Sequence, residues 1–134
     1  MHIEIVTPKG AVLKTEADEI TVPGVLGELG LFPGHIPIIT ALDVGEFTVK
    51  KGHTVNRYVV DGGFLEIAHD RVNVITETAV PVDTLDVDDL RNKRAVADEE
   101  MRSSINAAPA EAEAKVKALR RYEIMVGIAE RSRQ

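Results

Sequence analysis

The stretch Pro81-Val-Asp-Thr-Leu-Asp-Val-Asp-Asp-Leu-Arg91 divides the chain into two parts with different hydrophobic periodicities. Before it, apolar residues alternate with polar ones, as in strands, and after it they recur at helical spacing. Asp86 can cap a helix, and Asp88 lies in the first turn, where negative charge is favourable. The sequence therefore predicts an α+β chain with a first domain at 1–84 and a second at 85–134.

The first part is predicted to contain many short strands with no helix between them. Alternation begins at Ile3 and at Ile20, and further extended runs lie at 46–50, 55–60, 64–68 and 72–76. Turns are predicted at Lys51-Gly52, Asp61-Gly-Gly63 and His69-Asp-Arg71. Strands with such short connections pair as antiparallel hairpins. We therefore expect an N-terminal antiparallel β-sandwich or flattened barrel.

The second part predicts two helices, at about 87–104 and 109–131, that form a C-terminal antiparallel two-helix hairpin. Ser103, Ser104 and Asn106 form the break, and Pro109 is tolerated at a first helical position. Two helices of this length cannot fully bury their larger apolar side chains between themselves. The hairpin should therefore lean on the sandwich or on a partner and could move between them, unless it is an ordinary stabilising appendage.

The charge of the chain is uneven. Residues 1–84 hold six Lys and Arg against twelve Asp and Glu, whereas residues 85–134 hold ten of each kind. An acidic first part and a neutral second part argue against nucleic acid as a partner. No apolar run approaches the length of a bilayer span, and no leader pattern opens the sequence, which predicts a soluble, unprocessed chain without direct membrane insertion. The absence of cysteine fits a reducing compartment.

The sequence shows no catalytic constellation. The histidines at 2, 35, 53 and 69 are dispersed and lack metal-ligand spacing, and no serine or cysteine occupies a nucleophile motif. This pattern favours a binding or coupling protein that is not an enzyme and requires no cofactor. Two alternatives stay open: a generic β-sandwich interaction module, and a small cupin-like metalloenzyme whose sandwich houses a metal.

The segment Val22–Ile38 places glycines at 24, 27, 30 and 34 among apolar residues. A phosphate-binding loop needs converging N–H groups at a helix start and usually a lysine. The chain has no Lys or Arg between Thr15 and Val49, and an extended run rather than a helix follows Gly34. We therefore interpret the segment as a turn-rich loop whose apolar residues form a contact surface.

The second predicted helix carries a basic cluster: Lys115, Lys117, Arg120, Arg121, Arg131 and Arg133. Cations near a helix C-terminus are commonly solvated and complement the helix dipole. Docking to an acidic partner is the functional alternative.

Three parts of the first domain resemble one known family: the segment Val22–Thr40 with Gly45, then Asp61-Gly-Gly-Phe-Leu-Glu-Ile67, then Val72-Asn-Val-Ile75. The chain is similar over nearly its whole length to F-type ATP synthase epsilon subunits. That resemblance implies a β-sandwich with a helical hairpin, in a non-catalytic rotor subunit of a proton- or sodium-translocating enzyme. Such a subunit binds the gamma subunit and the c-ring and couples ring rotation to the catalytic head.

The resemblance also implies a location and a regulatory role. The subunit is peripheral at the cytoplasmic face of a bacterial inner membrane, or at the stromal face of the thylakoid. In bacterial members the hairpin extends along gamma and inhibits ATP hydrolysis. Arg120 and Arg121 would then approach an acidic loop of the catalytic beta subunit. The family's contact with the c-ring falls on Glu28, Leu29, Gly30 and His35.

Some family members bind regulatory ATP in the hairpin, through an Ile/Leu-Asp-x-x-Arg-Ala motif and arginines of the second helix. Here Asp88, Arg91 and Arg121 match that pattern. Asn92 stands where the motif has alanine, and Met125 stands where a further arginine is expected. Because each missing cation removes a charge-assisted contact to phosphate, we expect weak or absent ATP binding.

Overall fold

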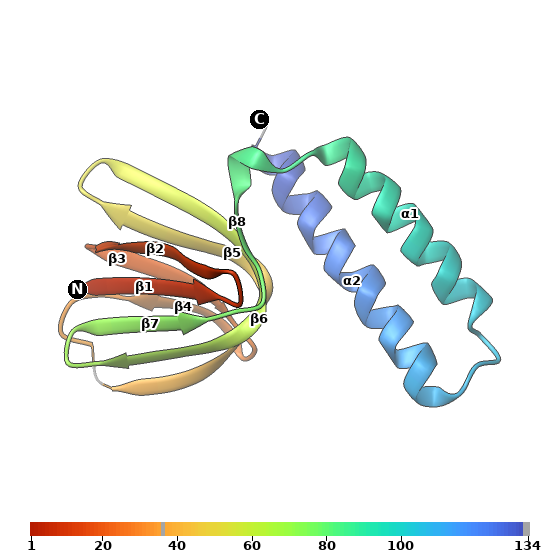
Figure 1. The fold of residues 1–134 in the computed structure, drawn as a ribbon, viewed down its shortest axis with the longest axis horizontal. Helices are drawn as coiled ribbons and strands as arrows, with labels where there is room; N and C mark the ends of the chain where they lie inside the picture. The colour runs from red at the N-terminus through yellow and green to blue at the C-terminus, as the bar shows by residue number, and fades with distance from the viewer. Residues whose placement is uncertain (36, 133–134) are drawn as a thin grey trace. The chain divides into compact units, whose positions relative to one another are not determined.

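The computed structural model describes residues 1–35 and 37–132, which form two compact units divided between Val82 and Asp83 (Figure 1). This division lies two residues before the predicted one. The first unit contains β1 (His2–Thr7), β2 (Gly10–Glu16), β3 (Glu19–Gly24), β4 (Gly27–Leu31), β5 (Ile38–Lys51), β6 (Thr54–Ala68), β7 (Arg71–Ile75) and β8 (Ala79–Pro81). A short 3-10 turn, η1 (Val82–Thr84), precedes α1 (Val87–Ser103) and α2 (Pro109–Ser132).

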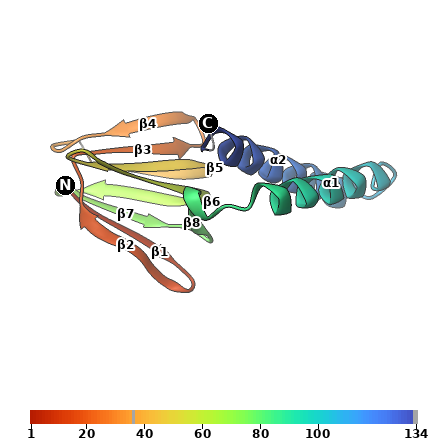
Figure 2. The ribbon, with the colours of Figure 1, turned by 90° about the horizontal axis from the view of Figure 1, so that it is seen from above.

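The strands follow the order β2-β1-β7-β6-β5-β3-β4, and β8 pairs with β6. Figure 2 shows β4 and β3 along one side of the sandwich and β1 and β2 along the other. The predicted sandwich is confirmed, with one exception to antiparallel pairing. β1 and β7 run parallel, from His2 opposite Arg71 to Val6 opposite Ile75.

The two longest strands, β5 and β6, take part in both layers of the sandwich. The predicted turn at Asp61-Gly-Gly63 is wrong, because β6 continues through it in one register with β5. Gly62 and Gly63 have φ values of 73° and 112°, which bend the strand without ending it. A Cβ on Gly63 would overlap the carbonyl oxygen of Ile75, so this position has room only for glycine. Residues typical of a turn therefore bend a continuous strand at this position.

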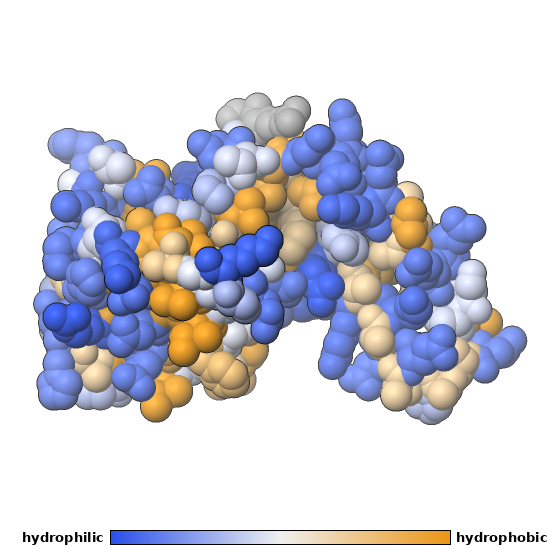
Figure 3. Space-filling view, viewed as in Figure 1, coloured by the Kyte–Doolittle hydropathy of each residue, from blue (hydrophilic) through white to orange (hydrophobic). Residues whose placement is uncertain are grey.

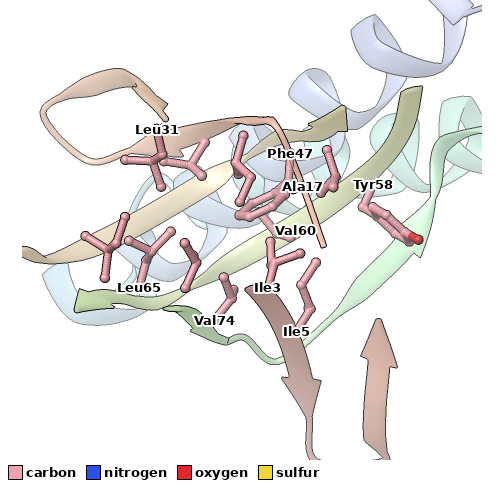
Figure 4. Close-up of a cluster of buried hydrophobic side chains, with 14 of the residues drawn as sticks. Ile3, Ile5, Ala17, Leu31, Phe47, Tyr58, Val60, Leu65 and Val74 are labelled. Atoms are coloured by element: carbon pink, nitrogen blue, oxygen red, sulfur yellow. The ribbon is translucent and has the colours of Figure 1, made fainter. Parts of the chain in front are cut away.

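A single hydrophobic core lies between the layers. Ile3 of β1, Phe47 of β5 and Leu65 of β6 are fully buried and point toward one another (Figure 4). Burying each such side chain contributes about 1.5–3 kcal/mol. Because neighbouring residues of a strand face opposite sides, this core also determines which residues face outward.

The glycine-rich segment forms a strand that the sequence did not predict. β4 pairs with β3 from Gly27 opposite Gly24 to Leu31 opposite Ile20, leaving Val25 and Leu26 as the turn. A Cβ on Gly24 would lie 2.8 Å from the carbonyl oxygen of Gly27. Glycine therefore permits a tight hairpin where a loop was expected. β2 and β8 were also not predicted.

The second unit is the predicted pair of helices, and both observed helices agree with the prediction to within one residue at each end. Asp86 caps α1, and its side chain accepts a hydrogen bond from the backbone N–H of Asp89 at 3.1 Å. The helices pack through a buried cluster of Val87, Leu90, Val126 and Ala129. Leu85, Tyr122 and Met125 add partly buried contacts to it.

Candidate functional site

The hairpin of β3 and β4 carries three of the four residues that the resemblance assigns to the c-ring. Glu28 and Gly30 are exposed on β4, which is an edge strand of the sheet. The side chain of Leu29 is partly buried and packs against the core. The strand therefore exposes the carboxylate of Glu28 and the backbone of Gly30, while Leu29 anchors it to the core.

Exposed apolar residues lie on both sides of Glu28 in the sequence. Leu26, at the tip of the turn, is 98% exposed, and Phe32, just after β4, is 53% exposed. His35 is partly buried, and its backbone N–H donates to the carbonyl oxygen of Phe32 at 3.1 Å. Glu28 thus belongs to a surface, here called the β4 surface, that combines exposed apolar side chains with negative charge.

A second apolar surface covers the outward side of β1, β7 and β6. Val6 lies opposite Ile75, and Ile75 lies opposite Phe64, so the three side chains form one row across the strands. Phe64 and Ile75 are 63% and 66% exposed. Figure 3 shows hydrophobic residues gathered on the side of the sandwich that carries β1 and β7. We call Val6, Ile75 and Phe64 the outer row; Ile39 of β5, which is 73% exposed, lies beside it, opposite Glu66.

The outer row borders a groove of about 490 Å³. Beside the row, Glu4, Asn73 and Glu66 follow one another across β1, β7 and β6. Glu4 is 3.7 Å from the ammonium group of Lys14, whereas Glu66 is exposed. The groove therefore has an apolar floor and an acidic edge, which suits a partner with apolar and basic side chains.

The sequence contains a signal for the outer row that strict alternation does not reveal. Phe64-Leu65 and Val74-Ile75 are pairs of adjacent apolar residues within strands. Because adjacent residues face opposite sides of a sheet, such pairs place apolar groups on both faces. Leu65 and Val74 are buried, so Phe64 and Ile75 must face outward.

Two of the three residues that match the ATP motif lie close together. The guanidinium of Arg91 is 3.7 Å from a carboxylate oxygen of Asp88 and 3.0 Å from one of Glu130 on α2. Arg121 is nine residues before Glu130 on α2, which is about 13 Å along the helix. Met125 packs partly buried against the hairpin cluster. Arg91 is therefore already paired with protein carboxylates. Arg121 lies more than two helical turns away from Glu130 along α2.

The remaining basic residues of the hairpin have varied surroundings. Arg120 is exposed and Arg121 is partly buried on α2, whereas Arg133 lies outside the described residues. Lys115 contacts Glu100 of α1 at 3.3 Å. A hydrogen bond from Lys93 to Asp89, together with the charge of Asp89, raises the pKa of Lys93. Lys93 therefore stays protonated well above neutral pH.

Two further observations concern the part of the chain that the structure describes. Neither of its helices is both long enough and apolar enough to span a bilayer. No group of three or more His, Asp or Glu side chains in residues 1–35 and 37–132 is arranged to hold a metal ion.

Comparison with proteins of known sequence assigns the chain to a family. Residues 1–82 match the model of the ATP synthase delta/epsilon chain β-sandwich domain. The ATP synthase epsilon chain of Myxococcus xanthus is 35% identical over 133 residues, covering 99% of this chain and 97% of that protein. ATP synthase epsilon chain 2 of Syntrophotalea carbinolica is 47% identical over 87 residues. That match covers 65% of this chain and spans 63% of the relative's length.

Solved structures agree with the sequence relatives. A chain of the Euglena gracilis mitochondrial ATP synthase, in an OSCP/F1/c-ring assembly, has a TM-score of 0.82 at 25% identity, covering 93% of this chain and 78% of that chain. A chain of the Tetrahymena thermophila central stalk and c-ring has the same fold, with a TM-score of 0.68 at 14% identity and 96% of both chains covered. With its sandwich matched by the family model and nearly its whole length matched by a relative, the chain belongs to the family of ATP synthase epsilon chains.

Proposed function

We propose that this chain is a central-stalk rotor subunit of an F-type ATP synthase, which couples rotation of the c-ring to the catalytic head and catalyses no reaction itself. Membership of the epsilon family supports this proposal, as does the likeness to a chain from an F1/c-ring assembly. The observation that carries it is the outer row, because adjacent exposed apolar side chains such as Phe64 and Ile75 are typical of a surface that binds another protein. Such a subunit resides at the cytoplasmic face of a bacterial inner membrane without entering the bilayer.

The gamma subunit is the partner that we assign to the outer row. Phe64 and Ile75 are more than half exposed beside a groove of about 490 Å³, so covering them removes apolar area from water. Glu66 at the edge of the groove favours a partner surface with basic residues. A rotor subunit needs a persistent attachment to gamma. An apolar row that becomes buried on binding supplies such an attachment.

The c-ring is the partner that we assign to the β4 surface. Its exposed Leu26 and Phe32 supply apolar contact, and Glu28 supplies a carboxylate. A cysteine in place of Glu28 is expected to crosslink to the polar loop of a c subunit in the assembled enzyme. The chain has no cysteine of its own, so any crosslink must come from the introduced residue. A crosslink to gamma instead would assign the β4 surface to the wrong partner.

A substitution in the outer row tests the attachment to gamma. Phe64→Asp removes a contact worth about 1.5–3 kcal/mol, so the affinity for gamma should fall about tenfold or more. Val55→Asp is the matched control, since Val55 is exposed on the same strand but lies at its opposite end, facing Lys50. Both variants should fold, because both side chains are exposed. Equal loss in the two variants would contradict docking at the outer row, and failure of the wild-type chain to co-purify with gamma and the c-ring would overturn the proposed function.

The hairpin is proposed to inhibit ATP hydrolysis when it extends, with Arg120 and Arg121 meeting an acidic loop of the beta subunit. Deleting the residues after Thr84 should therefore raise the ATPase activity of the assembled complex while assembly is retained. The buried residues of the sandwich core lie within residues 1–74 and are all retained in this variant. Unchanged activity would mean that the hairpin is only a structural appendage.

A further inference from the structure

Arg91 connects the beginning of α1 with the end of α2. Its Nη2 and Nε atoms both donate hydrogen bonds to one oxygen of Glu130, at 3.0 and 3.2 Å. Its Nη1 atom lies 3.7 Å from Asp88, one turn earlier on α1. Charge-assisted hydrogen bonds of this kind are stronger than those between neutral groups. The guanidinium is therefore shared between two carboxylates, of which only Glu130 belongs to the other helix.

The buried apolar cluster between the helices lies at the same end of the hairpin. Val87, Leu90, Val126 and Ala129 form the buried cluster, and they come from the first turn or two of α1 and the last two turns of α2. Toward the other end, the larger apolar residues Val96 and Val116 are more than half exposed. Because the hydrophobic cluster is small, ion pairs between the helices should contribute measurably to the stability of the hairpin.

Each helix also has features that stabilise it independently of its partner. The first half of α2, Pro109–Leu119, contains four alanines, which have the highest helix propensity. Lys117 and Glu113 form an ion pair within α2, and Arg102 and Asp98 form one within α1. These local features support each helix when the contacts between the two are broken.

We propose that the Arg91–Glu130 pair is a latch that controls how often the hairpin opens. Glu130 provides Arg91 with a built-in anionic partner, so the closed state requires no bound anion. An anionic ligand at Arg91 would have to displace Glu130. The inference deepens the proposed function, because an inhibitory hairpin must open before it can extend.

The test measures opening of the isolated full-length chain. In the cysteine-free sequence, Ala97→Cys introduces one thiol at a buried position of α1, six residues from Arg91. The rate at which a small thiol reagent labels this cysteine reports the fraction of time that the site is open. In this background, Glu130→Gln should raise the labelling rate about 1.5- to 5-fold, the range for an exposed ion pair.

Two controls make the result specific to the latch. Glu113→Gln removes a similar carboxylate from a pair that lies within α2, and it should leave the labelling rate unchanged. The double variant Arg91→Gln with Glu130→Gln should label no faster than the faster of the two single variants, since both break the same pair. High salt should bring the wild-type rate closer to that of Glu130→Gln, because salt screens exposed ion pairs.

Equal rates for Glu130→Gln and Glu113→Gln, or additive effects in the double variant, would overturn the latch. This outcome is distinguishable from failure of the proposed function, because labelling requires neither gamma nor the c-ring. If Glu130→Gln opens the hairpin but ATPase activity of the assembled complex does not change, the latch stands and the inhibitory role is wrong.

Discussion

The sandwich and the hairpin are each stabilised internally in a different way. In the sandwich, residues far apart in the sequence, such as Ile3, Phe47 and Leu65, meet in one core and are fully buried. In the hairpin, the buried cluster lies at one end, and the ion pairs between the helices use exposed side chains. A distributed core resists local change, whereas a small cluster near one end leaves the other end easier to open. The first unit is therefore suited to constant attachment and the second to a change of state.

The strongest test of this difference is the bend in β6. Gly63→Ala places a Cβ against the carbonyl oxygen of Ile75 at a φ of 112°. Backbone strain and overpacking together should lower the free energy of unfolding of the sandwich by about 2–6 kcal/mol. Urea unfolding measures the loss. Gly52→Ala is the control, because Gly52 also has a positive φ but open space around it. Its cost should be only about 1–2 kcal/mol, and equal costs would mean that the contact with Ile75 is unimportant.

Leu90→Ala tests whether the hairpin depends on its small cluster. Leu90 is buried in that cluster, and its truncation should destabilise the hairpin by about 2 kcal/mol, the lower end for such changes, because two helices can close around the gap. Far-ultraviolet circular dichroism follows loss of the helices, and in a Tyr122→Phe background the signal of Tyr58 in the core reports on the sandwich. Val96→Ala, at an exposed position of α1, should change stability by less than about 0.5 kcal/mol. Equal losses for Leu90→Ala and Val96→Ala would mean that the buried cluster does not stabilise the hairpin.

Asp86→Ala should have a smaller effect on the same helices. It removes the hydrogen bond to the N–H of Asp89 and should cost about 1 kcal/mol of helix stability. Asp88→Ala is the comparison, since Asp88 lies in the first turn but does not cap it, and its loss should cost a few tenths to about 1 kcal/mol. Thermal unfolding followed by circular dichroism ranks the two. A larger cost for Asp88 would assign its contact with Arg91 more weight than the cap.

Added ATP should have the smallest effect. With Arg91 engaged by Glu130 and Met125 packed partly buried against the cluster, 1 mM ATP should stabilise the hairpin by less than about 0.4 kcal/mol, which corresponds to a Kd of about 1 mM or weaker. Equilibrium dialysis of the full chain measures the same affinity directly. Micromolar binding that Arg91→Ala abolishes would show that ATP displaces Glu130.

Local patterns in the sequence predicted most of the architecture. The change at Pro81 predicted the boundary between strands and helices, and alternation at Ile3 and Ile20 predicted two strands correctly. Asp61-Gly-Gly63 was mistaken for a turn, because composition does not show whether positive φ values end a strand or bend it. The strand β4 in the glycine-rich segment was not predicted, because it forms only through hydrogen bonds to its partner strand β3, which composition does not show.

The candidate surfaces were less accessible to sequence reasoning. Glu28 and Gly30 were predicted as contact residues, and the structure shows both exposed. The outer row was not predicted, since it exists only where β1, β7 and β6 lie side by side. The pairing of Arg91 with Glu130 joins residues 39 positions apart, which no local pattern specifies.

The unbroken register of β5 and β6 has a mechanical consequence. Leu42 pairs with Gly63 before the bend and Val44 with Asp61 after it, so the same two strands run through both layers. A twisting load applied to one layer reaches the other through covalent backbone and ladder hydrogen bonds, in addition to side-chain packing. Sliding of one layer past the other would require these strands to break their pairing. The sandwich is therefore stiff in shear, which the proposed role in coupling rotation requires.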